Sequence, residues 1–214
     1  MSATEPETAT AQPPEPDIQA RLFAEQVSYL YQQLPAGLYG SLAVVAVLDF
    51  VLWDEISHPV LMIWTGIYVL VTAARLMLQA RYTRISVAQE DTHHWCMSFI
   101  VGACIAGIVW GAAGYFLMSA DSLGHQMMVL LVLAGVLAVA SQSLAAVFRI
   151  FVVFAVPALL PAIVWLSLQD TPVHLGMALM ASFFLLVTLL LSRRFSITLY
   201  ESFRLRFENI DLIS

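Results

Sequence analysis

The chain has 214 residues, of which 60% are hydrophobic and only 11% are charged. A soluble domain averages about a quarter charged residues, so this composition excludes an ordinary water-soluble domain and indicates that lipid covers most of the surface. The formal net charge of −6 comes from acidic residues in the leader and the loops, and we expect no nucleic-acid partner.

The first 34 residues predict two segments that do not cross the membrane. Residues 1–17 are rich in Pro, Glu, Thr and Ala and carry no signal-peptide pattern, which is typical of a disordered cytoplasmic leader. Residues 18–34 predict an amphipathic helix on the inner leaflet, with Asp17 as its cap. Its apolar residues recur at threes and fours: Ile18, Leu22, Phe23, Val27, Leu30 and Leu34.

Residues 35–192 contain six apolar stretches, each close to the length of about 20 residues that crosses a bilayer as a helix. The join around Phe148 and Arg149 is very short, so a single re-entrant element is the alternative to two helices there. We expect an all-α fold, a polytopic bundle of six transmembrane helices. The spans are Pro35–Trp53, Pro59–Ala80, Trp95–Met118, His125–Val147, Ile150–Leu168 and Val173–Ser192.

The basic residues predict the orientation of the bundle. The chain has nine arginines and no lysine. All nine fall on the same side of the six predicted spans, and the first, third and fifth loops have none. The positive-inside rule places the arginine side in the cytoplasm, so both termini are expected to be cytoplasmic.

Residues 193–214 predict a juxtamembrane helix that continues from the last span. Its apolar residues follow a 3-4-3 spacing, which is typical of a short coiled-coil seam; an interfacial continuation of the sixth helix is the alternative. The segment has no helix stop signal before Ser214, so we expect the native protein to be longer. The predicted signalling seam consists of Tyr200, Phe203, Phe207 and Ile210.

Polar and aromatic residues on the spans are candidates for a ligand site. Asp49, the acidic residue inside a predicted span, either faces a site within the bundle or reaches the outer head groups. A polar patch on the fourth span either satisfies backbone groups of its neighbour or lines a small pocket. The candidate ligand-binding residues are Asp49, Trp53, His58, Trp110, Ser141 and Gln142.

The outer loops repeat a carboxylate followed four residues later by a histidine. Converging imidazoles can bind a transition metal or titrate near neutral pH, which makes His58, His125 and His174 weak metal candidates. Chance and loop polarity explain the pattern easily, and we favour that interpretation. Cys96 and Cys104 are eight residues apart, which fits neither a zinc site nor a disulfide framework. We therefore expect no cofactor.

Small residues and prolines predict close packing between helices. Ala103, Gly107 and Gly111 lie four apart on the third span, a pattern that lets another helix approach closely. Pro157 and Pro161 lie on one face of the fifth span, where they are expected to bend it and to free carbonyl groups near residues 153 and 157.

Several of these residues together resemble a known family. His58-Pro59, Trp64, Trp110-Gly111, Pro157-x3-Pro161 and Leu205-Arg206-Phe207-Glu208-Asn209 resemble the membrane-embedded (MASE-type) sensor modules of bacterial diguanylate cyclases, phosphodiesterases and hybrid histidine kinases. The resemblance covers roughly residues 20–214. It implies a sensor in the bacterial inner membrane, whose last helix leads into a cytoplasmic output domain.

These patterns favour the sensory transmembrane region of a bacterial signalling protein. We expect a homodimer in the lipid bilayer, a cytoplasmic output domain in the same chain and a small apolar ligand. The sequence has no phosphate-binding loop, HExxH or GxSxG motif, so this segment is not expected to be an enzyme, although a kinase or diguanylate cyclase output is. The alternatives are a small transporter or channel-like protein and a purely structural membrane partner.

The orientation can be tested by cysteine labelling in intact cells. Single cysteines in place of Ile56, Ser122 and Thr171 should react with an impermeant maleimide from outside. Cysteines in place of Tyr82 or Phe195 should react only after the membrane is permeabilised, with the parent protein as the control for Cys96 and Cys104. External labelling at position 82 would reverse the assignment.

Overall fold

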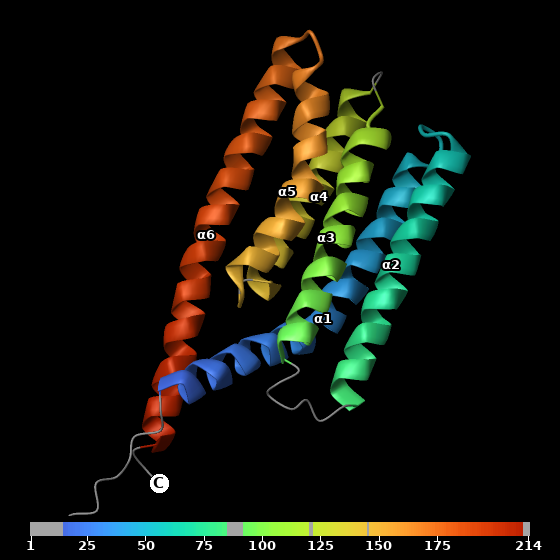
Figure 1. Cartoon of the computed structure of the whole chain (residues 1–214). Helices are drawn as coiled ribbons and strands as arrows, with labels where there is room; N and C mark the ends of the chain where they lie inside the picture. Colours follow the sequence, from blue (N-terminus) through green and yellow to red (C-terminus); the bar gives the residue numbers. More distant parts are fainter. Residues whose placement is uncertain (1–14, 85–91, 120–121, 145, 212–214) are drawn as a thin grey trace, which may run out of the picture.

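The computed structural model describes residues 15–84, 92–119, 122–144 and 146–211. In this part of the chain six α-helices form one bundle (Figure 1). The helices are α1 (Glu15–Leu52), α2 (His58–Arg84), α3 (Thr92–Phe116), α4 (Leu123–Ser143), α5 (Phe148–Ser167) and α6 (Pro172–Asp211).

The described helices confirm the predicted all-α, six-helix architecture of a multi-pass membrane protein. Each of the six is long and apolar enough to cross a membrane. Large apolar side chains also point outward, among them Phe50 at 83% and Leu131 at 74% exposed. Water would oppose such a surface, whereas hydrocarbon accepts it.

The join between α4 and α5 is a turn between two separate helices, as predicted. The helix α4 ends at Ser143, four residues before the expected boundary, and α5 begins at Phe148. The chain reverses at the lower end of the pair (Figure 1). The alternative of a single re-entrant element is therefore wrong. These two helices are the shortest of the described six, with 21 and 20 residues.

The predicted amphipathic segment and the first span belong to one continuous helix, α1, which changes direction in its middle (Figure 1). Pro35 lies inside α1, and its ring removes the N–H that would bond the carbonyl of Tyr31. The first half of α1 runs across the lower end of the bundle. There the amide of Gln26 donates a hydrogen bond of 2.9 Å to the carbonyl of Ala146, in the α4–α5 turn.

The apolar side of this first half faces protein. Leu22, Val27 and Leu30 are each no more than 2% exposed. The apolar face of this segment was expected to lie on the inner leaflet, but it is buried against the bundle. Because α4 and α5 are short, the space beneath their turn is open for the segment to fill. The side chain of Ile18 lies outside the described part.

Tyr31 holds the bend of α1 in place. Its ring is fully buried and stacks on Tyr82 of α2 at a centroid distance of 4.0 Å. It also meets the edges of Trp95 and Phe99 of α3. The Tyr31 hydroxyl donates to the carbonyl of Trp95 at 3.0 Å. Aromatic contacts of this kind add to simple burial, and here they tie three helices together at the lower end.

The glycines of α3 allow close contact with the proline helix α5, as the small-residue pattern predicted. A Cβ atom built on Gly107 would lie 2.4 Å from the carbonyl oxygen of Phe154, and one on Gly111 would lie 2.0 Å from that of Pro157. Because Pro161 has no N–H, the Pro157 carbonyl has lost its helical donor. Gly111 covers this carbonyl, an approach that only a residue without a side chain permits.

The polar patch of α4 does not serve the freed carbonyls of α5. The hydroxyl of Ser141 bonds the Ala138 carbonyl, and that of Ser143 bonds the Val139 carbonyl, both within α4. Gln142 is exposed. The predicted role of the patch in satisfying α5 is therefore wrong, since the glycine face of α3 covers the Pro157 carbonyl instead.

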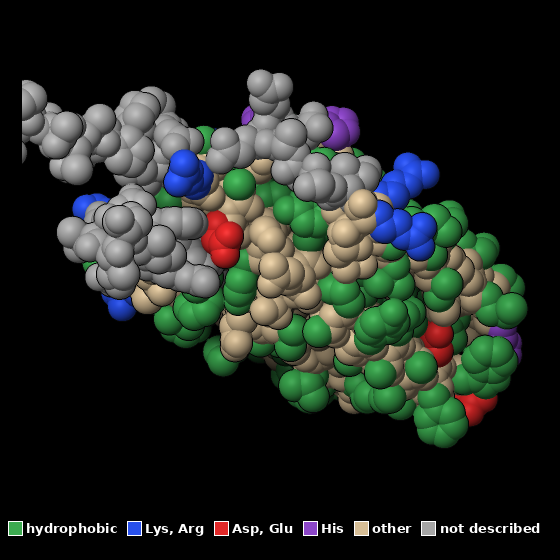
Figure 2. Space-filling model, turned by 90° about the horizontal axis from the view of Figure 1, so that it is seen from below, with side chains coloured by type: hydrophobic (Ala, Val, Ile, Leu, Met, Phe, Trp, Pro, Cys, Tyr) green, Lys and Arg blue, Asp and Glu red, His purple; other side chains and the backbone are tan. Residues whose placement is uncertain are grey.

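The last span and the juxtamembrane segment form one helix of 40 residues, α6. The beginning of α1 and the end of α6 lie together at the lower end of the bundle (Figure 1). Viewed from below, basic side chains surround this end (Figure 2). Tyr200 is 41% exposed, whereas the side chains of Phe203, Phe207 and Ile210 lie outside the described part, so the seam stays a prediction.

The contact between α3 and α5 predicts a large effect of one methyl group. Gly107→Ala should destabilise the protein by about 1–3 kcal/mol, because the new Cβ overlaps the Phe154 carbonyl oxygen and the helices must separate. Gly176→Ala is the matched control, since a Cβ there meets no atom within 4 Å. Thermal unfolding in detergent is the measurement. Equal melting temperatures for the two variants would show that α3 and α5 are not in contact.

Candidate functional site

Asp49 is held between α1 and α2. The hydroxyl of Thr65 lies 2.8 Å from both carboxyl oxygens of Asp49, and both residues are half-buried. This arrangement differs from both predicted roles, because the carboxyl group neither lines the cavity described below nor extends freely to the head groups. It joins two helices through one short hydrogen-bonded pair.

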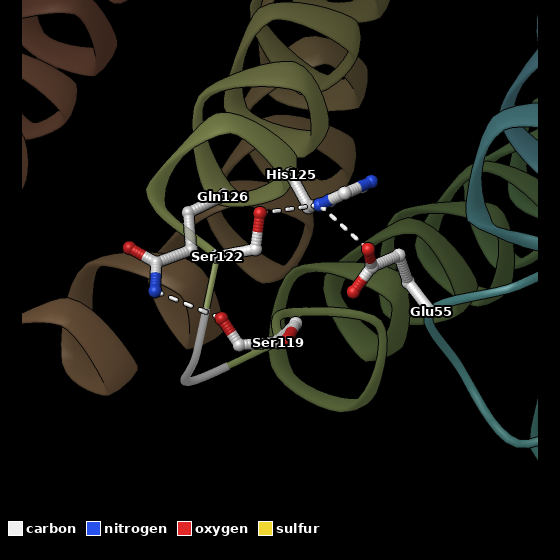
Figure 3. Close-up of polar contacts among 5 residues, drawn as sticks. All are labelled: Glu55, Ser119, Ser122, His125 and Gln126. Carbon is white, nitrogen blue, oxygen red and sulfur yellow. Dashed lines mark hydrogen bonds and ion pairs between the residues drawn. The ribbon is translucent and has the colours of Figure 1, made fainter.

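A polar cluster lies at the upper end of the bundle, where the α3–α4 loop meets the α1–α2 loop (Figure 3). The Nδ1 atom of His125 contacts the Ser122 hydroxyl and lies 3.8 Å from a carboxyl oxygen of Glu55. The Gln126 amide donates to the carbonyl of Ser119 at 2.8 Å. This cluster fixes the loop before α4 and joins it to the α1–α2 loop.

The three outer histidines have separate partners. His58 packs on Trp53 at a ring distance of 4.5 Å, and His174 contacts the hydroxyl of Thr171. His125 faces Glu55, which the spacing had not indicated. Among the described residues, no group of three or more His, Cys, Asp or Glu side chains could hold a metal ion, so the structure does not bring the weak metal candidates His58, His125 and His174 together.

A cavity of about 370 Å³ lies in the lower half of the bundle. It lies against the bend of α1 and is walled by α1, α2, α3 and α4, with Phe154 of α5 at one side. Most of its lining is apolar. Its polar lining residues are Gln33, Ser41, Tyr68, Thr72, Arg75 and Ser143, together with the indole of Trp110.

Tyr68 and Trp110 line the deep wall of this cavity, and Trp64 packs against both of them. The rings of Trp64, Tyr68 and Trp110 contact one another at centroid distances of 5.3 to 5.8 Å. The indole N–H of Trp64 donates to the Val109 carbonyl at 2.8 Å. The Tyr68 hydroxyl donates to Ser41 of α1. The wall is therefore rigid and is joined to the second half of α1.

Arg75 enters the same cavity from α2. Its side chain passes along Gly102 of α3, where a Cβ would lie 3.5 Å from the arginine Cγ. Its guanidinium carbon lies 5.7 Å from the centre of the Phe99 ring, an arrangement typical of a cation–π contact. Arg75 is thus directed inward into the bundle.

The cavity opens sideways between α1 and α4. Gln33, Ala36 and Gly40 on α1 and Gly135 and Val139 on α4 are exposed lining residues. A Cβ built on Gly40 or Gly135 would meet no atom within 4 Å. Because both helices are membrane spans, this opening faces the hydrocarbon.

Of the predicted ligand residues, only Trp110 lines this cavity. Asp49, Trp53 and His58 lie nearer the upper end, and Ser141 and Gln142 are not among the lining residues. Sequence reasoning missed Arg75, Tyr68 and the glycines of α1. An arginine within a span and Gly37 and Gly40 three residues apart are the signals that could have indicated them.

Comparisons of the chain with models of protein families, with curated proteins and with solved structures give no match in any of the three.

The Asp49–Thr65 pair predicts a measurable contribution to stability. Thr65→Val should cost about 0.6–1.7 kcal/mol, the range of hydrogen bonds between membrane helices, because it leaves the carboxyl group without its donor. Thr188→Val is the control, since the Thr188 hydroxyl bonds the Phe184 carbonyl of its own helix. The measurement is thermal unfolding in detergent. If Thr188→Val lowers the melting temperature more than Thr65→Val does, the pair does not join α1 to α2.

Proposed function

We propose that the chain is the transmembrane sensory region of a bacterial signalling protein in the inner membrane. In this proposal the arginine end is cytoplasmic, and α6 passes a signal from the bundle to a cytoplasmic output domain. The observation that carries it is the length of α6. A helix of 40 residues is about 60 Å long, roughly twice the hydrocarbon thickness of a bilayer. The part of α6 that exceeds the hydrocarbon thickness projects from the arginine end of the bundle.

The bend of α1 supports a route from the cavity to α6. Residues 30–44 of α1 line the cavity, and the first half of α1 packs against α6 at the lower end (Figure 1). Phe23 of α1 and Leu199 of α6 are both partly buried against the same core. A ligand that enters the cavity therefore presses on a helix that is already in contact with the projecting part of α6.

The output step rests on dimerisation of the projecting helix. Tyr200 is 41% exposed on the monomer, and its predicted seam partners follow it at coiled-coil spacing. Two such helices side by side have alternative rotations that an output domain can distinguish. In this proposal the homodimer is joined through Tyr200, Phe203, Phe207 and Ile210, and the output domain responds to the rotation of the two α6 helices.

The rotational phase of α6 is the quantity to test. One residue inserted after Arg194 rotates everything downstream by about 100° and should lock or abolish output. Seven inserted residues restore the heptad phase and should largely preserve it. Output activity is measured in membranes that contain the sensor together with its output domain.

Crosslinking of Phe203→Cys provides the structural control. The cysteine should form a disulfide between two copies in the parent and after the seven-residue insertion, and much less after the single insertion. If both insertions retain output and position 203 never crosslinks, α6 is only a tether and the proposed mechanism is wrong.

A further inference from the structure

Arg75 brings a positive charge into a mostly apolar cavity. No carboxylate among the described residues lies within ion-pair distance of it. Its described neighbours include the Phe99 ring and the Gly102 backbone, and the phenol groups of Tyr31 and Tyr68 are near enough to interact with its charge. A charge in such surroundings is costly unless it is paired. The arrangement therefore favours an anion as the partner of this guanidinium.

The cavity changes in character along its length. Arg75, Gln33 and Ser143 lie towards the lower ends of their helices, and Tyr68 and Trp110 lie deeper. The step from Arg75 to Tyr68 along α2 is seven residues, or about 10 Å. The positive charge thus lies at the lower end of the cavity, and the deep end is aromatic, with the hydroxyls of Tyr68 and Ser41 bonded to each other. This gradient matches a molecule with an anionic head group and an apolar tail.

The opening between α1 and α4 supplies the route of entry. It faces the hydrocarbon at the level of the inner half of the bundle. A molecule that lies in the inner leaflet, with its head group at the interface and its tail towards the midplane, already has the orientation that the cavity needs. A ligand dissolved in the membrane can therefore enter without crossing water.

We propose that this cavity binds an amphipathic anion with a single acyl chain, whose negatively charged head group pairs with Arg75. A cavity of about 370 Å³ is near the lower end of the range for ligand pockets, which favours one short chain over two. A free fatty acid and a single-chain phospholipid share this chemistry. The idea that this ligand acts as a signal depends on the proposed sensory function, whereas the idea that the cavity binds it does not.

Binding is tested by quenching of Trp110, which is 2% exposed and lines the deep end. The whole chain is placed in phosphatidylcholine nanodiscs at a pH that ionises the probe. The probes are bromoundecanoic acid, with bromine on its terminal carbon, and a lysophosphatidylglycerol brominated at its chain end. Saturable quenching that Trp110→Phe reduces is the expected result, since Trp64 remains in contact with the deep wall. The probe that binds more tightly identifies the source of the anion.

Two variants separate charge from shape. Arg75→Gln should weaken binding of the acid about ten- to a hundredfold and leave binding of the uncharged bromoundecanol unchanged, whereas Arg75→Lys should retain part of the affinity. Gly37→Leu should block both probes, because Gly37 lines the cavity and a Cβ there meets no atom within 4 Å. Gly176→Leu, equally unhindered but on α6 away from the cavity, should bind normally.

The proposal is overturned if neither anionic probe quenches Trp110 saturably, or if bromoundecanol binds as tightly as the acid and Arg75→Gln changes neither. Should Arg75→Gln fail to fold, Arg75→Lys and Gly37→Leu still decide the question. Binding without any effect on output would refute the proposed sensory function and leave the ligand site intact. Output that responds normally in Gly37→Leu would refute this ligand as the signal and leave the sensory function standing.

Discussion

The contact between α3 and α5 is the constraint around which the bundle is arranged. No water is present in a bilayer core to bond an exposed carbonyl, so a backbone group freed by proline needs a protein partner or cover. Pro161 frees the carbonyl of Pro157, and the glycine face of α3 covers it at a distance that excludes any side chain. This contact brings α5 against α3 and leaves α4 on the other side, facing α1.

The position of α4 explains why a cavity exists. Where α1 and α4 face each other, Gly37, Gly40 and Gly135 present no side chains to fill the space. The bend at Pro35 then carries the first half of α1 beneath the bundle, where Tyr31 anchors it. The same bend thus forms one wall of the cavity and brings α1 into contact with α6.

The glycines have two different uses in this protein, and only their surroundings distinguish them. On α3, the backbone of α5 lies directly against Gly107 and Gly111, so there is no room for an added methyl group. On α1 and α4, Gly37, Gly40 and Gly135 adjoin open space. The spacing of small residues alone cannot separate these uses, because both kinds follow a three- or four-residue repeat in an apolar helix.

The sequence alone determined the class of the fold, since six long apolar stretches can be satisfied only by helices that cross a bilayer. It also predicted the gathering of arginines at one end and the close approach at Gly107 and Gly111. Among the residues that line the cavity, it predicted only Trp110 as a ligand residue. Arg75 was not among the predicted site residues, and Asp49 was expected either to face a site within the bundle or to reach the outer head groups. Only tertiary structure decided these cases, because the direction of a side chain from a helix depends on which neighbour leaves room for it. The cavity is such a space, and it belongs to no single segment of the sequence.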